Sequence, residues 1–253
     1  MKKTVLLFLP ILLSTTILHA QTISDSDDSN STLHEQKNVI KLNLFALALK
    51  SVTVEYERRI SRKTTVALDL RVMPKSTLPF KSSFESSISD STTKSQLDNF
   101  KTGNFAIMPQ IRFYLSRRGA YHGFYIAPFF SYAHYTADVP YNYTDNGVDK
   151  TIPLAGTVNT VTGGIMFGSQ WALGKTVYLD WWIFGPHYGG SSGSLVGRQS
   201  LSSSEQQALQ SDFNSLDIPI ANTTSTVDAN GATLNFSGPW AGLRSGLCIG
   251  FRF

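Results

Sequence analysis

Hydrophobic and polar residues alternate with a period of two along most of the chain from Asn38 to its end. Ile107, Ile111 and Phe113 fall on one parity, for example, while Gln110 and Arg112 fall on the other. A period of two is that of a β-strand, whose successive side chains point to opposite faces. The pattern predicts eight strands, at residues 40–44, 52–57, 66–72, 105–115, 123–135, 157–173, 176–188 and 241–253. The register of the fifth strand stays open, because Tyr125 and Phe129 are aromatic on the parity opposite to Phe124.

The lengths of the connections alternate as well. Short turns are expected at residues 61–63, 117–121 and 174–175, and long loops at 74–103, 137–156 and 189–239. Only the first connection, around residues 49–51, breaks this rule by being short. Alternating short and long connections are typical of transmembrane barrels, with short turns in the periplasm and long loops outside the cell. The sequence therefore predicts an all-β fold, an eight-stranded antiparallel up-and-down transmembrane β-barrel over residues 38–253.

The charged side chains indicate which face of the strands meets lipid. Nearly all strand charges share one parity, and a mid-membrane Arg or Lys facing lipid would cost roughly 2 to 4 kcal/mol. We therefore expect these charges to line the barrel interior, which eight strands leave just wide enough for side chains to fill. The expected polar network comprises Lys41, Glu55, Glu57, Arg59, Asp69, Arg71, Arg112, Asp180, Arg244 and Arg252, with Glu57 and Arg252 as a candidate pair. A narrow conducting pore, or a soluble barrel with an apolar cavity, are the alternatives.

Composition and aromatic placement agree with a membrane barrel. Only 16% of the 253 residues are charged, against roughly a quarter in an ordinary soluble domain, and no apolar run past the N-terminus is long enough for a spanning helix. Aromatic residues gather near the two predicted rims, as in the girdles of outer-membrane barrels. They are Phe113, Phe124, Trp171, Phe251 and Phe253 at the periplasmic rim, and Phe105, Tyr132, Phe184 and Trp240 at the outer one.

The N-terminal segment has the features of an export signal. Lys2 and Lys3 precede an apolar stretch, and Leu18-His19-Ala20 precedes the expected cleavage site although its leucine is larger than ideal, which predicts a signal peptide over residues 1–20. Residues 21–37 are rich in Ser, Asp and Thr and are expected to form a flexible periplasmic leader. Removal of the signal lowers the formal charge from +4 to +2, and no basic patch indicates nucleic-acid binding. The single cysteine, Cys248, forms no intramolecular disulfide.

Candidate catalytic groups lack a convincing arrangement. Ser131 and His134, with Asp138 beyond, lie near the outer end of the fifth strand, but residues three apart on a strand face opposite ways. His122 and His187 have no partner at a metal-binding spacing. We therefore expect no catalytic, cofactor or metal site.

Two stretches of the last predicted loop have local signatures of their own. The Gly189–Ser194 stretch indicates a flexible linker rather than a phosphate loop, because no lysine follows it. Further on, the Ser202–Glu205 stretch is a capping box that opens a short helix, with five apolar residues available for packing: Leu201, Ala208, Leu209, Phe213 and Leu216. Such a loop could form a recognition surface, cover the barrel mouth, or simply fold onto the rim.

Five blocks of sequence carry a resemblance to known proteins. The terminal strand over residues 246–253, with Phe251 and Phe253 at its end, resembles the assembly signal of Gram-negative outer-membrane barrels. Residues 38–43, 54–58, 109–114 and 123–128 resemble an uncharacterised outer-membrane family of Bacteroidota-type bacteria, a domain of unknown function.

The resemblance implies an outer-membrane barrel without supplying an activity. Expected partners are outer-membrane lipid, the outer-membrane assembly machinery, and an extracellular or envelope protein bound by the loops. The expected role is structural or in surface recognition, with a plugged polar interior. The alternatives are an enzyme that modifies outer-leaflet lipid and a narrow channel.

Overall fold

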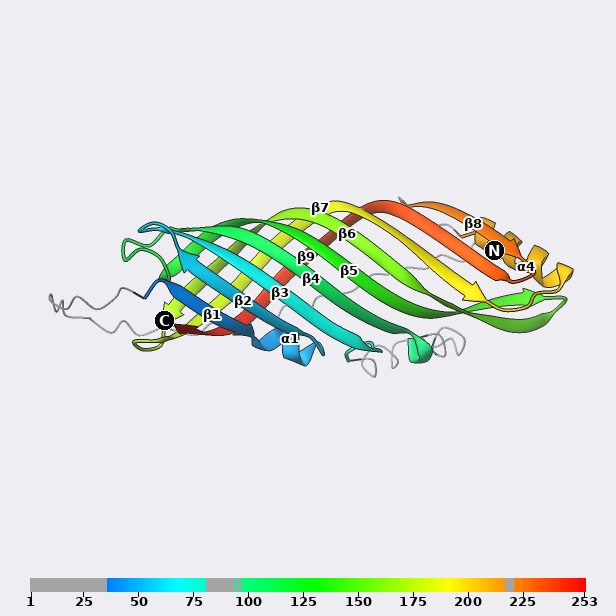
Figure 1. Ribbon diagram of the computed structural model, residues 1–253, viewed down its shortest axis with the longest axis horizontal. Helices are drawn as coiled ribbons and strands as arrows, with labels where there is room; N and C mark the ends of the chain where they lie inside the picture. The colour runs from blue at the N-terminus through cyan, green and yellow to red at the C-terminus, as the bar shows by residue number, and fades with distance from the viewer. Residues whose placement is uncertain (1–35, 81–93, 95–96, 217–220) are drawn as a thin grey trace.

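A computed structural model describes residues 36–80, 94, 97–216 and 221–253. The predicted signal peptide and most of the predicted leader lie outside the described residues. The fold is almost entirely antiparallel β-structure (Figure 1). Its elements are β1 (Asn38–Asn43), α1 (Leu44–Ala48), β2 (Val52–Arg59), β3 (Thr64–Thr77), β4 (Lys101–Tyr114), β5 (Gly123–Asp145), β6 (Val148–Ala172), β7 (Val177–Arg198), α4 (Ser203–Asn214), β8 (Asn222–Asp228) and β9 (Gly231–Arg252). No helix in the described part of the chain is both long and apolar enough to cross a membrane.

Eight of the strands form a closed ring. The order is β1-β2-β3-β4-β5-β6-β7-β9, and β9 pairs with β1 to close it. At the closing ladder Asn38 and Phe253 exchange two backbone hydrogen bonds, of 3.1 and 2.9 Å. β8 lies outside the ring and pairs only with β9. The predicted eight-stranded antiparallel up-and-down barrel is confirmed.

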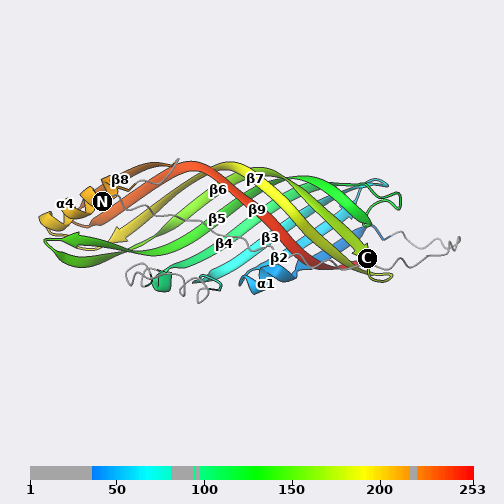
Figure 2. The same cartoon turned by 180° about the vertical axis from the view of Figure 1, so that it is seen from behind.

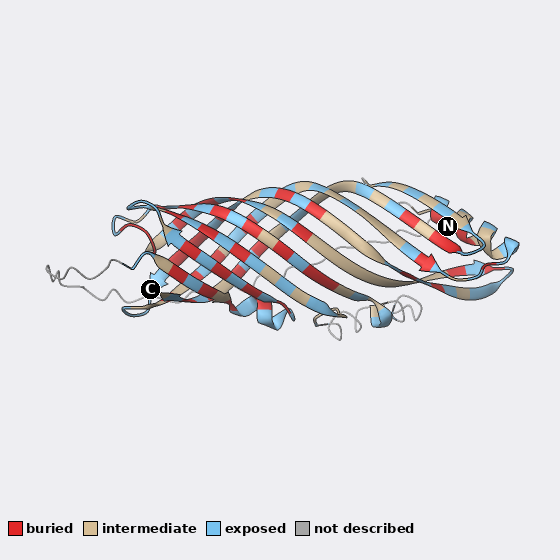
Figure 3. Cartoon of the chain, viewed as in Figure 1, coloured by how far each residue is buried: buried red, intermediate tan, exposed pale blue. Residues whose placement is uncertain are grey.

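The predicted sorting of side chains between the two faces is also confirmed. In β5, Phe124, Ile126, Phe130 and Tyr132 are exposed on the outside, while Tyr125 is buried inside the ring. The register that the sequence left open is therefore settled, and the blurred pattern arises because aromatic rings also fill the interior. Burial follows the same alternation around the ring (Figure 3).

The short helix α1 replaces the outer half of β1. The sequence pattern extends the first strand to Leu44, which is wrong, because the Asn43 side chain accepts a hydrogen bond from the Ala46 amide (3.1 Å) and caps a helix at that point. Leu44, Phe45, Leu47 and Leu49 remain exposed on or beside this helix.

Two of the predicted loops are largely strand. Residues 137–156 are expected to form a loop, but β5 and β6 continue through it to a two-residue turn at Asn146 and Gly147, both with positive φ. Asn-Gly with left-handed backbone is the preferred tight hairpin turn. Residues 189–239 are likewise expected to be loop, yet they contain the end of β7, α4, β8 and the start of β9.

The Gly189–Ser194 stretch is strand rather than a flexible linker. It is hydrogen-bonded to β6 on one side and β9 on the other. A Cβ atom at Gly189 would lie 2.0 Å from the carbonyl oxygen of Val161, so only glycine permits this close approach.

Pro74 does not end the third strand. β3 continues to Thr77 across a register shift between Met73 and Ser76, where a bulge accommodates the residue that cannot donate to the ladder. The loop predicted at 74–103 is correspondingly shorter, since β4 begins at Lys101.

Beyond the ring, four long strands continue on one side as a curved sheet that carries β8 and α4 (Figures 1 and 2). We call residues 139–154, 195–216 and 221–236 the extension. Helix α4 packs against β5 and β8, the two outer strands of this sheet. It begins with the predicted capping box, in which Ser202 and Glu205 bond each other's backbone amides. The predicted packing residues are confirmed: Leu201, Leu209 and Phe213 are buried with Tyr143, Ile152, Leu154 and Ala232, and Ala208 and Leu216 pack against them.

Candidate functional site

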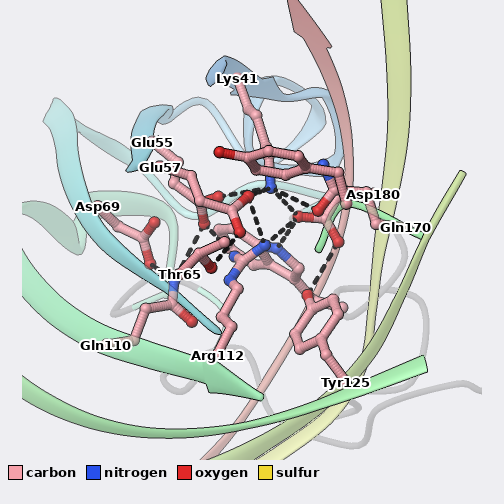
Figure 4. A network of polar contacts seen from close by, with 12 residues as sticks. Lys41, Glu55, Glu57, Thr65, Asp69, Gln110, Arg112, Tyr125, Gln170 and Asp180 are labelled. Carbon is pink, nitrogen blue, oxygen red and sulfur yellow. Dashed lines mark hydrogen bonds and ion pairs between the residues drawn. The ribbon is translucent and has the colours of Figure 1, made fainter. Parts of the chain in front are cut away.

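The densest polar site is an ion cluster inside the ring, near the end with short turns. Lys41 of β1 and Arg112 of β4 point inward and meet three carboxylates, Glu55 and Glu57 of β2 and Asp180 of β7 (Figure 4). Both cations lie 2.6 Å from the same Asp180 oxygen, and Lys41 lies 2.8 Å from Glu55. Arg112 also contacts Glu57 at 3.4 Å and pairs with Glu55. All five side chains are buried.

Neutral polar groups complete the coordination of these charges. Gln110 donates hydrogen bonds to Glu55 (3.0 Å) and Asp69 (3.1 Å), and the Tyr125 hydroxyl donates to Asp180 (2.8 Å). The Tyr114 hydroxyl lies 2.7 Å from Glu57 and 2.6 Å from Gln170. Buried charges need such partners, because an unpaired one retains its desolvation cost. The cluster therefore ties β1, β2, β4, β5, β6 and β7 together across the barrel.

Three carboxylates within 4.8 Å of one another could in principle hold a metal ion. Here the Lys41 ammonium and the Arg112 guanidinium already lie among them. The two protein cations supply the charge that a metal would bring, so the donor set does not fit a metal in addition. The arrangement acts as an ionic lock.

A layer of aromatic rings lies between the ion cluster and the turns. Tyr121 sits in the β4–β5 turn with a φ of 70°, and its buried ring packs edge-on against Tyr114 and Tyr178. Its hydroxyl donates to the Lys37 carbonyl (2.5 Å), and the Arg252 guanidinium lies 5.1 Å from its ring centre. Together with the ion cluster, these rings fill the end of the barrel that carries the short turns.

The other expected network residues lie above and below this cluster. Asp69 and Arg244 form an ion pair of 2.6 Å nearer the extension, and Arg71 donates to Thr53 (3.4 Å) at that level. Arg59 and Arg252 are half-buried at the turn end.

The expected Glu57–Arg252 pair is wrong. Arg252 instead donates to the Gln36 carbonyl (2.8 Å) and the Tyr178 hydroxyl (2.9 Å). Val39 explains the separation, because it is the ladder partner of Glu57 on one side and Arg252 on the other, and its buried side chain lies in the same row. Two strand spacings, about 10 Å, separate residues so related.

The residues considered for catalysis are not brought together. The His134 ring bonds Asn159 (2.8 Å), and Asp138 pairs with Lys75 (2.5 Å) on the surface. The His122 ring bonds the Ala120 carbonyl (3.0 Å), while His187 packs edge-on against Phe129. Among the described residues these groups form no nucleophile–base pair.

A second polar cluster attaches α4 to the β5–β6 hairpin. Lys150 lies 2.8 Å from Asp145 and 2.9 Å from Glu205, the capping residue of α4. The backbone amide of Ser202 and the Lys150 ammonium hold the pKa of Glu205 down at about 2. Hydrogen bonds to Asp145 and Glu205 raise the pKa of Lys150. When Glu205, Asp145 and Lys150 are ionised, their ion pairs hold the start of α4 against the β5–β6 hairpin.

Sequence reasoning missed several interior residues that matter. Gln110 and Tyr114 share the parity of Arg112, so the sequence predicts that they point inward. It does not predict their hydrogen-bond partners, which lie on strands distant in the sequence. Tyr121 fell in a turn, where no periodic signal exists.

Comparison with known proteins identifies a family and one structural likeness. No curated protein matches the chain. A solved structure, the translocator domain of autotransporter NalP from Neisseria meningitidis, is 15% identical with a TM-score of 0.34, over 87% of this chain and 90% of that chain. A family described as "Protein of unknown function (DUF3575)" matches residues 11–185, more than half of the chain. The protein therefore belongs to the DUF3575 family of unknown function.

Proposed function

We propose that this protein spans the outer membrane as a closed barrel and holds its extension outside the cell as a recognition surface. The observation that carries the proposal is a belt of large apolar side chains on the outside of the ring, 36–62% exposed in β5 and β6. The belt stops at one level: Tyr132 and Val161 are ladder partners at its edge, and the next outward pair is polar, His134 and Asn159.

The height of the belt fits a membrane. In β5 it runs from Phe124 to Tyr132 and in β6 from Val161 to Trp171, which are nine and eleven residues. A tilted transmembrane strand needs about 9 to 11 residues. Aromatic residues mark both edges of the belt, as is typical of the interfaces of such barrels.

The filled interior favours a static role over transport. The ion cluster and the aromatic layer fill the interior at the end of the barrel that carries the short turns. The interior of an eight-stranded barrel is just wide enough for such side chains. We expect the purified protein to give no steady single-channel steps in planar bilayers. Regular stepwise conductance would instead support the channel alternative.

Cysteine labelling tests the orientation. The native Cys248 is buried, so among the described residues labelling reports on the introduced cysteine alone. Arg198→Cys at the tip of β7 should react with a membrane-impermeant maleimide on intact cells. Lys63→Cys, an exposed position in the β2–β3 turn, should react only after the outer membrane is permeabilised. Labelling of Lys63→Cys on intact cells, or recovery of the protein in the soluble fraction, would contradict the proposal.

Recognition by the extension can be tested without disturbing the ring. A deletion variant can carry an Asn-Gly turn in place of residues 199–230, because Arg198 and Gly231 are ladder partners and the turn joins β7 to β9 directly. This variant lacks α4 and β8 and should keep the ring folded. A photoreactive side chain at Gln207, exposed on α4, should cross-link an envelope or surface partner, whereas one at Lys63 should not capture it. Identical cross-links from both positions would count against the extension as the binding surface.

We also propose that the outer-membrane assembly machinery recognises the terminal strand. Phe251 of β9 and Phe253, the residue after this strand, are both exposed. Phe253→Ser should lower the amount of barrel assembled in cells while refolding in detergent stays close to normal. Equal losses in both assays would show that the residue acts through stability alone.

A further inference from the structure

The barrel wall has a seam in the half nearer the extension. The β1–β9 ladder ends at the Asn43–Cys248 pair, and the chain then turns into α1. From Leu247 back to Gly238, β9 has ladder partners in β7 alone, until β8 joins at Ser237. Both sides of this seam lie within the described residues, and α1 packs beside β9 there (Figure 2).

Two arginines face the interior at the level of the seam. Arg244 projects from β9 itself; its guanidinium lies 4.8 Å from the ring centres of Phe129 and Trp182 and donates through Nη2 to Asp69 (2.6 Å). Its Nε and Nη1 groups have no hydrogen-bond partner, although the side chain is only 7% exposed. A buried donor without a partner is costly, so these two groups are available to an acceptor such as a ligand oxygen.

Arg71 reaches the same level from β3. It is half-buried and donates through Nε to Thr53 (3.4 Å), the residue next to the start of β2. Among the described residues no carboxylate lies within ion-pair distance of it. Arg71 lies two residues beyond Asp69 on β3 and shares its inward parity, and Asp69 is the ion-pair partner of Arg244, so this one carboxylate has an arginine on its own strand and another across the barrel. The Nδ1 atom of His187 also has no hydrogen-bond partner.

Charge therefore changes sign along the barrel axis. The deep ion cluster has three carboxylates for two cations, whereas the seam level has one carboxylate, Asp69, for two. Paired guanidinium groups match the geometry of a phosphate group, which can accept two parallel hydrogen bonds from each.

We propose that Arg71 and Arg244 bind a phosphate group at this level, and that the seam admits the phosphate-bearing headgroup of a membrane lipid. The phosphate site follows from the interior geometry alone, whereas the lipid source rests on the proposed membrane position. Glycine at positions 242 and 246 of β9 leaves room for neighbouring side chains on either side of Arg244: a Cβ atom at Gly242 would lie 2.6 Å from His187, and one at Gly246 would lie 2.3 Å from Asn43.

Binding can be measured on the full chain folded in dodecyl maltoside, an uncharged detergent. The probes are inorganic phosphate, with chloride holding ionic strength constant, and dioctanoyl phosphatidic acid in mixed micelles, with dioctanoylglycerol as the phosphate-free control. Trp182 lies against Arg244, so tryptophan fluorescence reports on the site, and the thermal midpoint gives an independent reading.

Arg71→Gln removes one contact to the probe and only one weak internal hydrogen bond, so the barrel should fold. The double variant Arg244→Gln/Asp69→Asn removes the other guanidinium while keeping the level free of an unpaired carboxylate. The matched control is Arg198→Gln, an exposed arginine in the extension.

We expect a saturable response to at least one phosphate probe, weakened about tenfold or more by Arg71→Gln and by the double variant, and unchanged by Arg198→Gln. A response to both probes assigns the site to phosphate in general, and a response to phosphatidic acid alone assigns it to lipid. The proposal is overturned if neither probe gives a saturable response, or if Arg71→Gln and the double variant both retain the affinity of the unaltered protein. Either failure leaves the labelling test of membrane orientation unaffected.

Discussion

Replacement of Arg112 by glutamine tests whether the ion cluster stabilises the barrel. Arg112 is buried and contacts Asp180 at 2.6 Å, Glu57 at 3.4 Å, and Glu55. Without it, Lys41 would be the only cation among three carboxylates that lie within 4.8 Å of one another. The glutamine is uncharged and shorter, so it cannot restore any of the three ion pairs.

The expected cost is about 3 to 5 kcal/mol of unfolding free energy. Breaking a buried ion pair by removing one partner typically costs this much, because the remaining charge stays desolvated. Simple addition of three charged hydrogen bonds at about 1.5 to 3 kcal/mol each would overshoot, since contacts within one network are not additive. At about 1.4 kcal/mol per factor of ten, the folded-to-unfolded ratio falls by about a hundred-fold to a few thousand-fold.

Glu55→Gln provides the contrast. It leaves two cations with two carboxylates, and one Glu55 oxygen has no well-aligned hydrogen bond, although Lys41 lies 2.8 Å away. We expect a loss of about 1 to 2 kcal/mol. In the double variant Arg112→Gln/Glu55→Gln the cost should be less than the sum of the single costs, because the second change removes a carboxylate that the first left unpaired.

Reversible urea unfolding in lipid vesicles, followed by tryptophan fluorescence and by heat-dependent gel mobility, measures these differences. Arg198→Gln, on an exposed arginine, should stay within about 0.5 kcal/mol of the unaltered protein. The reasoning is refuted if Arg112→Gln costs no more than Arg198→Gln, or if Glu55→Gln proves the more damaging of the two cluster variants.

Three further predictions concern the strands and the extension. Gly189→Ala should reduce the yield of folded barrel, because its Cβ would lie 2.0 Å from a β6 carbonyl oxygen, whereas Gly190→Ala, with no atom within 4 Å, should fold normally in the same gel assay. The pKa of Glu205 in the folded protein, about 2, lies below its ordinary value, so the stabilisation that its carboxylate gives α4 is complete above about pH 5 and is lost as the pH falls toward 2. Protection of the α4 amides from exchange should decrease over this pH range, and Glu205→Gln should abolish this pH dependence. Phe213→Ala should cost the extension about 3 to 5 kcal/mol and expose α4 to proteases while the ring keeps its heat-dependent mobility; equal sensitivity of the exposed neighbour Asn214→Ala would contradict the packing argument.

The ring was predictable because parity alone defines it. Each strand of the ring places apolar groups outside and polar or aromatic groups inside, and residues such as Ile111 and Arg112 make the two sides distinct. Above Tyr132 this contrast disappears, since outward positions such as Thr136 and Asp138 face water and no longer differ in polarity from loop residues. The extension was therefore interpreted as loop, although its helix was visible from the Ser202 cap.

The contents of the interior were only partly predictable. Direction follows from parity, so the inward placement of Lys41, Glu57 and Asp180 could be expected. Pairing depends on the register between strands far apart in sequence, and Val39 between Glu57 and Arg252 is a feature that no single strand reveals. Tyr121 and α1 depend on local backbone geometry that breaks the period altogether.

The meeting of Asn38 with Phe253 has a consequence for biogenesis. Strand β9 supplies the partner for both β1 and β7, so neither ladder can form before residues 231–252 have been synthesised and are free to pair. Until then β1 and β7 each have an unpaired edge and the ring is open. Closing it costs the loop-closure entropy of bringing together strands at opposite ends of the barrel sequence. A chain truncated before β9 should therefore leave the ring open, and we expect it to be degraded rather than to form a partly working barrel.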